Sequence, residues 1–87
     1  MTREEFVNWV KTSSGFENES SLGLSDSYWR RELDYADLIY DYLEIEENEV
    51  VYRWEEVYWG GSEFRSRVFE FSDFVAAFET DEISAIR

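Results

Sequence analysis

Four carboxylates recur at a spacing of three, four and three residues: Asp34, Asp37, Asp41 and Glu44. Residues three and four apart are neighbours on the surface of an α-helix. A row of carboxylates can accept bidentate hydrogen bonds from arginine or bind a hard cation, and a suitably spaced pair can act as acid and base. These residue types and this spacing therefore predict a binding surface for positive charge.

The composition excludes most catalytic chemistry. The chain has no histidine and no cysteine, so the usual general base, nucleophile pairs and zinc ligands are missing. It has no glycine-rich phosphate loop, and its densest acidic run, residues 44–49, lacks the glycine and spacing of a calcium-binding loop. With 21 acids, a carboxylate pair at a catalytic separation arises by chance. We predict a protein that is not an enzyme and needs no metal or cofactor.

The charge balance points to the class of partner. The 87 residues carry 21 acids against eight basic residues, a net charge of −13. Such a charge repels nucleic acid and anionic membranes, and it attracts basic proteins. Aromatic residues make up 20% of the chain, which argues for a folded core rather than disorder. No apolar run has membrane-spanning length and no leader-like segment starts the chain. The lack of cysteine favours the cytoplasm, that of the host cell if the protein is phage-encoded.

The four acids need a helix to bring them together. Ser25 or Asp26 would cap a helix over residues 26–45, whose apolar arc is broad and mainly aromatic. The four acids fall beside that arc, which predicts that they are exposed. Glu46, Glu47 and Glu49 would extend the row past the helix end, and Arg30 or Arg31 would close its start by pairing with Asp34.

The remaining elements flank this helix. Thr2 and Glu5 have the spacing of a capping box and begin a helix that should end near Ser14–Gly15. Residues 15–25 read as an ordered loop anchored by Phe16, Leu22 and Leu24.

Two strand-like segments surround Gly60–Gly61, which suits a two-residue hairpin turn with Trp59 opposite Ser62. Trp59 is then the aromatic residue expected to be most exposed. Ser72–Asp73 would cap a last helix.

The predicted fold class is α+β. Residues 1–87 would form a small single acidic domain with the order α-α-β-β-α, in which a two-stranded antiparallel hairpin packs on helices.

The spacing of the acids along the predicted helix is comparable to that of phosphates along a nucleic-acid strand. The chain is therefore predicted to mimic nucleic acid and to inhibit a basic nucleic-acid-binding protein, such as a nuclease or a defence complex. It would bind no nucleic acid itself. The predicted partner-binding residues are Asp34, Asp37, Asp41, Glu44, Glu46, Glu47, Glu49 and Trp59. In size, acidity and lack of catalytic groups the chain resembles the anti-CRISPR and anti-restriction proteins of phages and mobile elements.

Three alternatives stay open. The chain could be an immunity protein or antitoxin that binds a nuclease toxin. It could be an adaptor that binds another protein, or a second copy of itself as a homodimer, through an exposed aromatic patch. The acids could also serve solubility alone.

Overall fold

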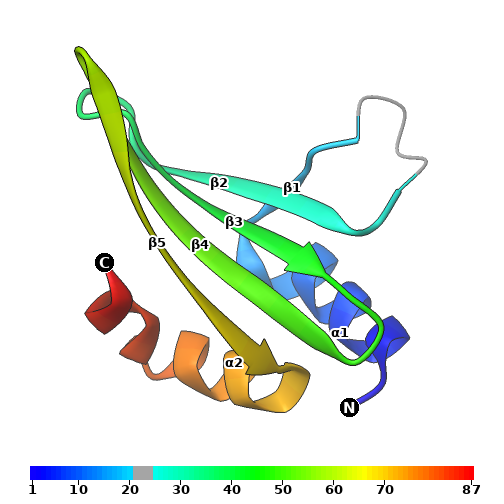
Figure 1. Ribbon diagram of the computed structural model, residues 1–87. Helices are drawn as coiled ribbons and strands as arrows, with labels where there is room; N and C mark the ends of the chain where they lie inside the picture. Colours follow the sequence, from blue (N-terminus) through cyan, green and yellow to red (C-terminus); the bar gives the residue numbers. More distant parts are fainter. Residues whose placement is uncertain (21–24) are drawn as a thin grey trace.

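The protein is a five-stranded antiparallel sheet with helices packed on one of its faces (Figure 1). The computed structural model describes residues 1–20 and 25–87. In chain order the elements are α1 (Arg3–Trp9), the π-helical turn η1 (Val10–Ser14), β1 (Glu17–Asn18), β2 (Tyr28–Asp34), β3 (Ile39–Ile45), β4 (Glu49–Tyr58), β5 (Gly61–Glu70), α2 (Phe71–Glu79) and the 3-10 helix η2 (Glu82–Ile86).

The sheet is a meander in which each strand pairs with the next one along the chain, in the order β1-β2-β3-β4-β5. The β4–β5 pairing is unbroken over ten residue pairs, from Glu49 opposite Glu70 to Tyr58 opposite Gly61. The β2–β3 register shifts once, between Glu32 and Asp34. The chain therefore contains much more sheet than its acidic spacing suggests.

The predicted helix over residues 26–45 is wrong. This segment forms β2 and β3, joined by a turn at residues 35–38 in which Leu38 has a φ of 53°. Strict alternation places Leu43 and Ile45 on the covered face of the sheet, and β-branched and aromatic residues favour this extended form. The predicted α+β fold with the order α-α-β-β-α and a sheet of only two strands is therefore also wrong. The structure is mostly sheet, with a short N-terminal helix and a C-terminal helix.

The predicted ends of the first helix are confirmed. The Thr2 side chain accepts a hydrogen bond from the Glu5 backbone N–H at 3.1 Å, and the Glu5 carboxylate accepts one from the Thr2 N–H at 2.9 Å. Gly15 ends this helical segment with a φ of 81°, a conformation that favours glycine. Phe16 is buried as expected, whereas Leu22 and Leu24 lie outside the described residues.

The C-terminal helix is also confirmed, but it begins earlier than its predicted cap. α2 follows β5 without a loop, and Glu70 rather than Ser72 or Asp73 occupies the N-cap position. η2 then continues the chain and buries Ile83.

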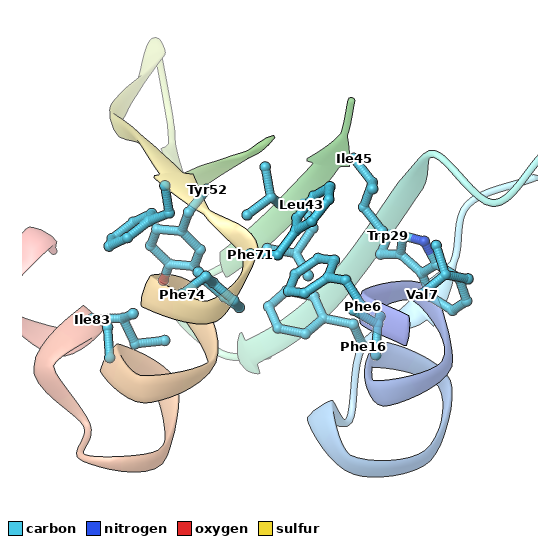
Figure 2. Close-up of a cluster of buried hydrophobic side chains, with 14 of the residues drawn as sticks. Phe6, Val7, Phe16, Trp29, Leu43, Ile45, Tyr52, Phe71, Phe74 and Ile83 are labelled. Carbon is cyan, nitrogen blue, oxygen red and sulfur yellow. The ribbon is translucent and has the colours of Figure 1, made fainter. Parts of the chain in front are cut away.

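The core lies between the helices and the covered face of the sheet (Figure 2). Aromatic rings dominate it: Phe6 stacks on Phe71 with ring centroids 4.8 Å apart, and Phe74 meets Phe69 edge-on at 5.5 Å. Phe6, Phe74 and Tyr52 are fully buried. Each aromatic side chain buries a large area, so a few rings are enough to fill this small core.

The β4–β5 hairpin is confirmed, with its register moved by two residues from the predicted one. Tyr58 pairs with Gly61, so the central turn residues are Trp59 and Gly60. A shift of two leaves every side chain on its expected face. Gly60 has a φ of 93°, which side-chain-bearing residues rarely adopt, whereas Gly61 lies in the strand.

This register gives the two glycines different roles. We expect Gly60→Ala to lower the free energy of unfolding by about 1–2 kcal/mol, because alanine is strained at this φ. Gly61→Ala should change it by less than about 0.5 kcal/mol, because the added Cβ would make only ordinary contact with the Tyr58 ring at 3.7 Å. Urea denaturation of both variants makes the comparison. Equal losses would contradict the observed turn.

Candidate functional site

Asp41 is a buried structural carboxylate and not part of an exposed stripe. It is 0% exposed and faces the core from the middle of β3. Arg31 on β2 holds both of its oxygens, with Nε donating to Oδ1 at 3.1 Å and Nη2 donating to Oδ2 at 2.6 Å. The Tyr52 hydroxyl on β4 also donates to Oδ2, at 2.8 Å. Burial of a charge requires such partners.

Arg87 joins the same group from the C-terminal segment. Its Nη2 lies 3.6 Å from Asp41 Oδ2, and its Nε donates to the Tyr52 hydroxyl at 3.3 Å. We call Arg31, Asp41, Tyr52 and Arg87 the Asp41 cluster. It binds two neighbouring strands and the end of the chain to β3. Because these polar groups satisfy one another, Asp41 has no oxygen left for a partner or a reaction.

The Asp41 cluster also perturbs a tyrosine. Burial, followed by the nearby negative charge of Asp41, raises the pKa of Tyr52 well above its ordinary value of 10.0. The hydrogen bond from Arg87 works in the opposite direction and is outweighed. Tyr52 therefore stays a neutral hydrogen-bond donor to Asp41 at ordinary pH.

The other predicted site residues lie at the two ends of the sheet. Asp34 and Asp37 lie at the β2–β3 turn, where the Asp34 carboxylate accepts a hydrogen bond from the Asp37 backbone N–H at 3.1 Å. Trp59 lies at the neighbouring β4–β5 turn and is 100% exposed, as the sequence predicts. Asp34 thus shapes its own turn.

Glu44, Glu46, Glu47 and Glu49 lie at the opposite end, around the β3–β4 turn, and all four are exposed. The length of β4 separates the two ends by about 30 Å at 3.3 Å per residue. The structure therefore does not bring the eight predicted residues into one row: it buries one and divides the rest between two distant places.

Around the β3–β4 turn the structure creates a different row. The Glu46 N–H bonds to the Glu49 carbonyl at 2.8 Å across the turn, and Glu49 lies directly opposite Glu70 on β5. Alternation from the buried neighbours Ile45, Val50 and Phe69 places all three glutamates on the face of the sheet away from the helices. Glu44 lies on the same face, one row further in. We call Glu44, Glu46, Glu49 and Glu70 the acidic end.

The basic residues do not neutralise the acidic end. Six of the eight form ion pairs elsewhere: Arg3 with Asp26, Arg30 with Glu19, Arg31 and Arg87 with Asp41, Arg53 with Glu55, and Arg65 with Glu63. In the described part of the chain no ion pair includes a residue of the acidic end. The four carboxylates of the acidic end are therefore exposed to solvent.

The uncovered face of the sheet carries a second kind of surface. Its exposed apolar side chains include Tyr28, Phe64 and Val68, each more than half exposed. The Arg53 guanidinium lies 4.8 Å from the Phe64 ring centroid and also pairs with Glu55 at 2.8 Å. A groove on this face is lined by residues that include Tyr28, Tyr42, Val51 and Arg53. This mixture of rings and arginine is typical of protein-binding surfaces.

Glu70 and the Asp41 cluster were not predicted from the sequence. The signal for the Asp41 cluster was period-two alternation in residues 39–45, where Ile39, Asp41, Leu43 and Ile45 share a face. An acid in that set indicates a buried charge that needs an arginine. Glu70 was missed because the predicted register placed Glu49 opposite Ser72.

No metal site and no membrane span are seen in residues 1–20 and 25–87. The acids there form no group that could hold a metal ion. No helix there combines the length and the apolar character needed to cross a membrane.

Neither a protein-family model, nor a curated protein sequence, nor a solved structure matches the chain. We therefore infer what the protein binds from its own surfaces.

The Asp41 cluster predicts a large difference between two acids of one strand. Asp41→Asn should lower the free energy of unfolding by about 3 kcal/mol, because it leaves Arg31 and Arg87 without their carboxylate. Glu44→Gln removes the same charge from an exposed site of β3 and should change stability by less than about 0.5 kcal/mol. Chemical denaturation measures both, and similar values for the two variants would contradict a structural role for Asp41.

The raised pKa of Tyr52 predicts a loss of stability in alkali. The folded protein disfavours the tyrosinate, so this contribution is complete below the unfolded pKa near 10 and declines as the pH rises above it. Between about pH 9 and about pH 11, the free energy of unfolding should fall more steeply in the wild type than in Tyr52→Phe, by up to about 1.4 kcal/mol per pH unit. Parallel pH profiles would show that Tyr52 titrates normally.

Proposed function

We propose that this protein is a non-catalytic inhibitor that mimics nucleic acid and blocks the basic groove of a nucleic-acid-binding protein through its acidic end. The observation that carries the proposal is a row of three exposed glutamates that form no ion pair in the described part of the chain: Glu46 directly after β3, Glu49 on β4 and Glu70 on β5. Asp41 has no part in it, and Asp34 and Asp37 lie too far away to join it.

The row is costly for the fold. Like charges directly opposite each other on antiparallel strands are destabilising, and Glu49 and Glu70 are such a pair. A lysine or arginine at position 49 would remove this repulsion, whereas the N-terminus of α2 favours a negative charge at Glu70. Six basic residues instead form ion pairs elsewhere, and Arg67 stacks on the Phe69 ring at 4.9 Å. A surface that keeps a repulsive row exposed is suited to a cationic partner.

The spacing of the row supports mimicry of a phosphate backbone. Neighbouring strands lie about 4.8 Å apart, so the three carboxylates follow one another at roughly that interval. One strand of DNA carries a charge every ~3.4 Å of axial rise. Arginine forms the same bidentate hydrogen bonds with carboxylate and with phosphate. A groove that binds successive phosphates can therefore bind successive glutamates.

Two alternatives share parts of this surface. An immunity protein or antitoxin would direct the same acidic end at the basic active site of a nuclease toxin. An adaptor would use the uncovered face instead, and the exposure of Tyr28, Phe64 and Val68 favours it as the second candidate. The two kinds of binding differ in their salt dependence, because only the electrostatic kind is screened.

A variant of the acidic end tests the proposal. Glu46→Gln, Glu49→Gln and Glu70→Gln together should weaken capture of the target by tenfold or more, since charge-assisted hydrogen bonds contribute about 1.5–3 kcal/mol each. The control removes three exposed charges elsewhere: Glu4→Gln, Glu17→Gln and Glu79→Gln. Tagged wild type, variant and control are used in pull-downs from the host lysate at about 50 mM and about 200 mM salt, with and without duplex DNA.

If the proposal is correct, the tagged wild type captures a nucleic-acid-binding protein. Duplex DNA should displace that protein, and the higher salt concentration should release it. Equal loss in the variant and the control would mean that net charge alone matters. Capture that survives both salt and DNA and is lost in Phe64→Ser would favour the adaptor.

A further inference from the structure

We propose that β5 is a self-association edge, along which two copies of this chain pair antiparallel about a two-fold axis at Phe64 and form one continuous sheet. The proposal is independent of the proposed function. Among the described residues, β5 is the last strand of the sheet and pairs only with β4 (Figure 1). Gly61 to Val68 are all exposed. An exposed edge of this length is a template for pairing with another strand.

The hydrogen-bond pattern shows which groups are available. Val57 N–H bonds to the Leu38 carbonyl, so the odd residues of β4 pair with β3 and the even ones with β5. The even residues of β4 lie opposite the odd residues of β5. The outward backbone groups therefore belong to Ser62, Phe64, Ser66 and Val68. In the described part of the chain, no backbone hydrogen bond outside the β4–β5 ladder involves any of them.

β5 lacks three of the features by which proteins protect an edge, although it carries the charged residues Glu63, Arg65, Arg67 and Glu70. It contains no proline, no lysine and no bulge over its ten pairs with β4. The opposite edge differs, because β1 is only two residues long. β5 is also neutral within a chain of charge −13, with Glu63 and Glu70 balanced by Arg65 and Arg67. A second copy can approach here without a local excess of like charge.

Charge complementarity selects the register. Facing residues must lie on the same face, so the axis can pass through Phe64, Arg65 or Ser66. An axis at Phe64 places Glu63 opposite Arg65 of the second copy, twice, and brings the two Phe64 rings together. An axis at Arg65 pairs Glu63 with Arg67 but opposes the two Arg65 side chains, and an axis at Ser66 opposes Arg65 and Arg67. Opposite charges and aromatic pairs across strands are stabilising, whereas like charges are not. The axis at Phe64 is thus the one that opposes no like charges.

The same register keeps the acidic ends apart. Glu70 lies six residues from the axis, so the two Glu70 residues would be about 40 Å apart at 3.3 Å per residue. The Debye length at physiological ionic strength is about 8 Å, so repulsion between the acidic ends is screened. The hairpin tip of each copy, with its exposed Trp59, would lie alongside Val68 of the other. Pairing thus places the exposed apolar residues of β5 beside apolar residues of the second copy.

Charge reversal tests the edge and its register together. Glu63→Arg places arginine opposite Arg65, and Arg65→Glu places glutamate opposite Glu63. Each variant alone should be monomeric under conditions where the wild type dimerises. An equimolar mixture should restore a dimer, because the two arginines of the first variant then face the two glutamates of the second. Sedimentation velocity at protein concentrations from about 1 μM to about 1 mM covers the dissociation constants expected for such an interface.

The side chains of Glu63 and Arg65 are each 47% exposed, so both variants should stay folded, which circular dichroism and thermal melting check. Ser66→Pro gives a second test, because it removes an outward N–H without touching the ladder to β4. We expect it to weaken dimerisation at least tenfold. A wild type that stays monomeric at about 1 mM, or a mixture that remains monomeric, would overturn the proposal.

Discussion

The burial of Asp41 organises the rest of the structure. A carboxylate without solvent needs positive charge and hydrogen-bond donors around it. Arg31, Tyr52 and Arg87 supply them from β2, β4 and the C-terminal segment. Each of these segments is held in register with β3 by a polar contact as well as by packing. Arg31 further lies over the rings of Phe16 and Phe78, at 4.7 and 5.3 Å, so the polar cluster and the aromatic core form one unit.

This arrangement determines how the charge of the chain is distributed. Three of the eight basic residues, Arg31, Arg87 and Arg53, lie in the interior cluster or on the uncovered face, each beside an acid. Others pair near the N-terminal helix or along β5. The surplus acids remain at the surface, and the β3–β4 turn concentrates four of them on one face.

The sequence predicted the parts whose signals are local. The capping box at Thr2, the glycine that ends the first helix, the β4–β5 hairpin and the exposed Trp59 depend on a few neighbouring residues, and all are present. Residues 28–45 were mispredicted because apolar positions such as Ile39, Leu43 and Tyr42 satisfy a helical period and, in part, a strand period. The period-two alternation of residues 39–45 favours the strand, whereas the partners that allow Asp41 to be buried, Arg31 and Arg87, lie outside that segment. The acidic end could be recognised only from the pairing of Glu49 with Glu70, and the predicted β4–β5 register was wrong by two residues.

The meander has a consequence for how the chain reaches this structure. Every strand pairs with the neighbour that precedes or follows it, so the sheet can form from successive local hairpins with small loop-closure entropy. The contacts between the chain ends are different. Phe6 of α1 stacks on Phe71 and meets Phe74 of the C-terminal half, and Arg87 reaches Asp41 near the middle. These contacts join residues far apart in the sequence, so forming them early would cost more loop-closure entropy. The topology therefore favours a folding order in which hairpins form early and the aromatic core and the Asp41 cluster are completed last.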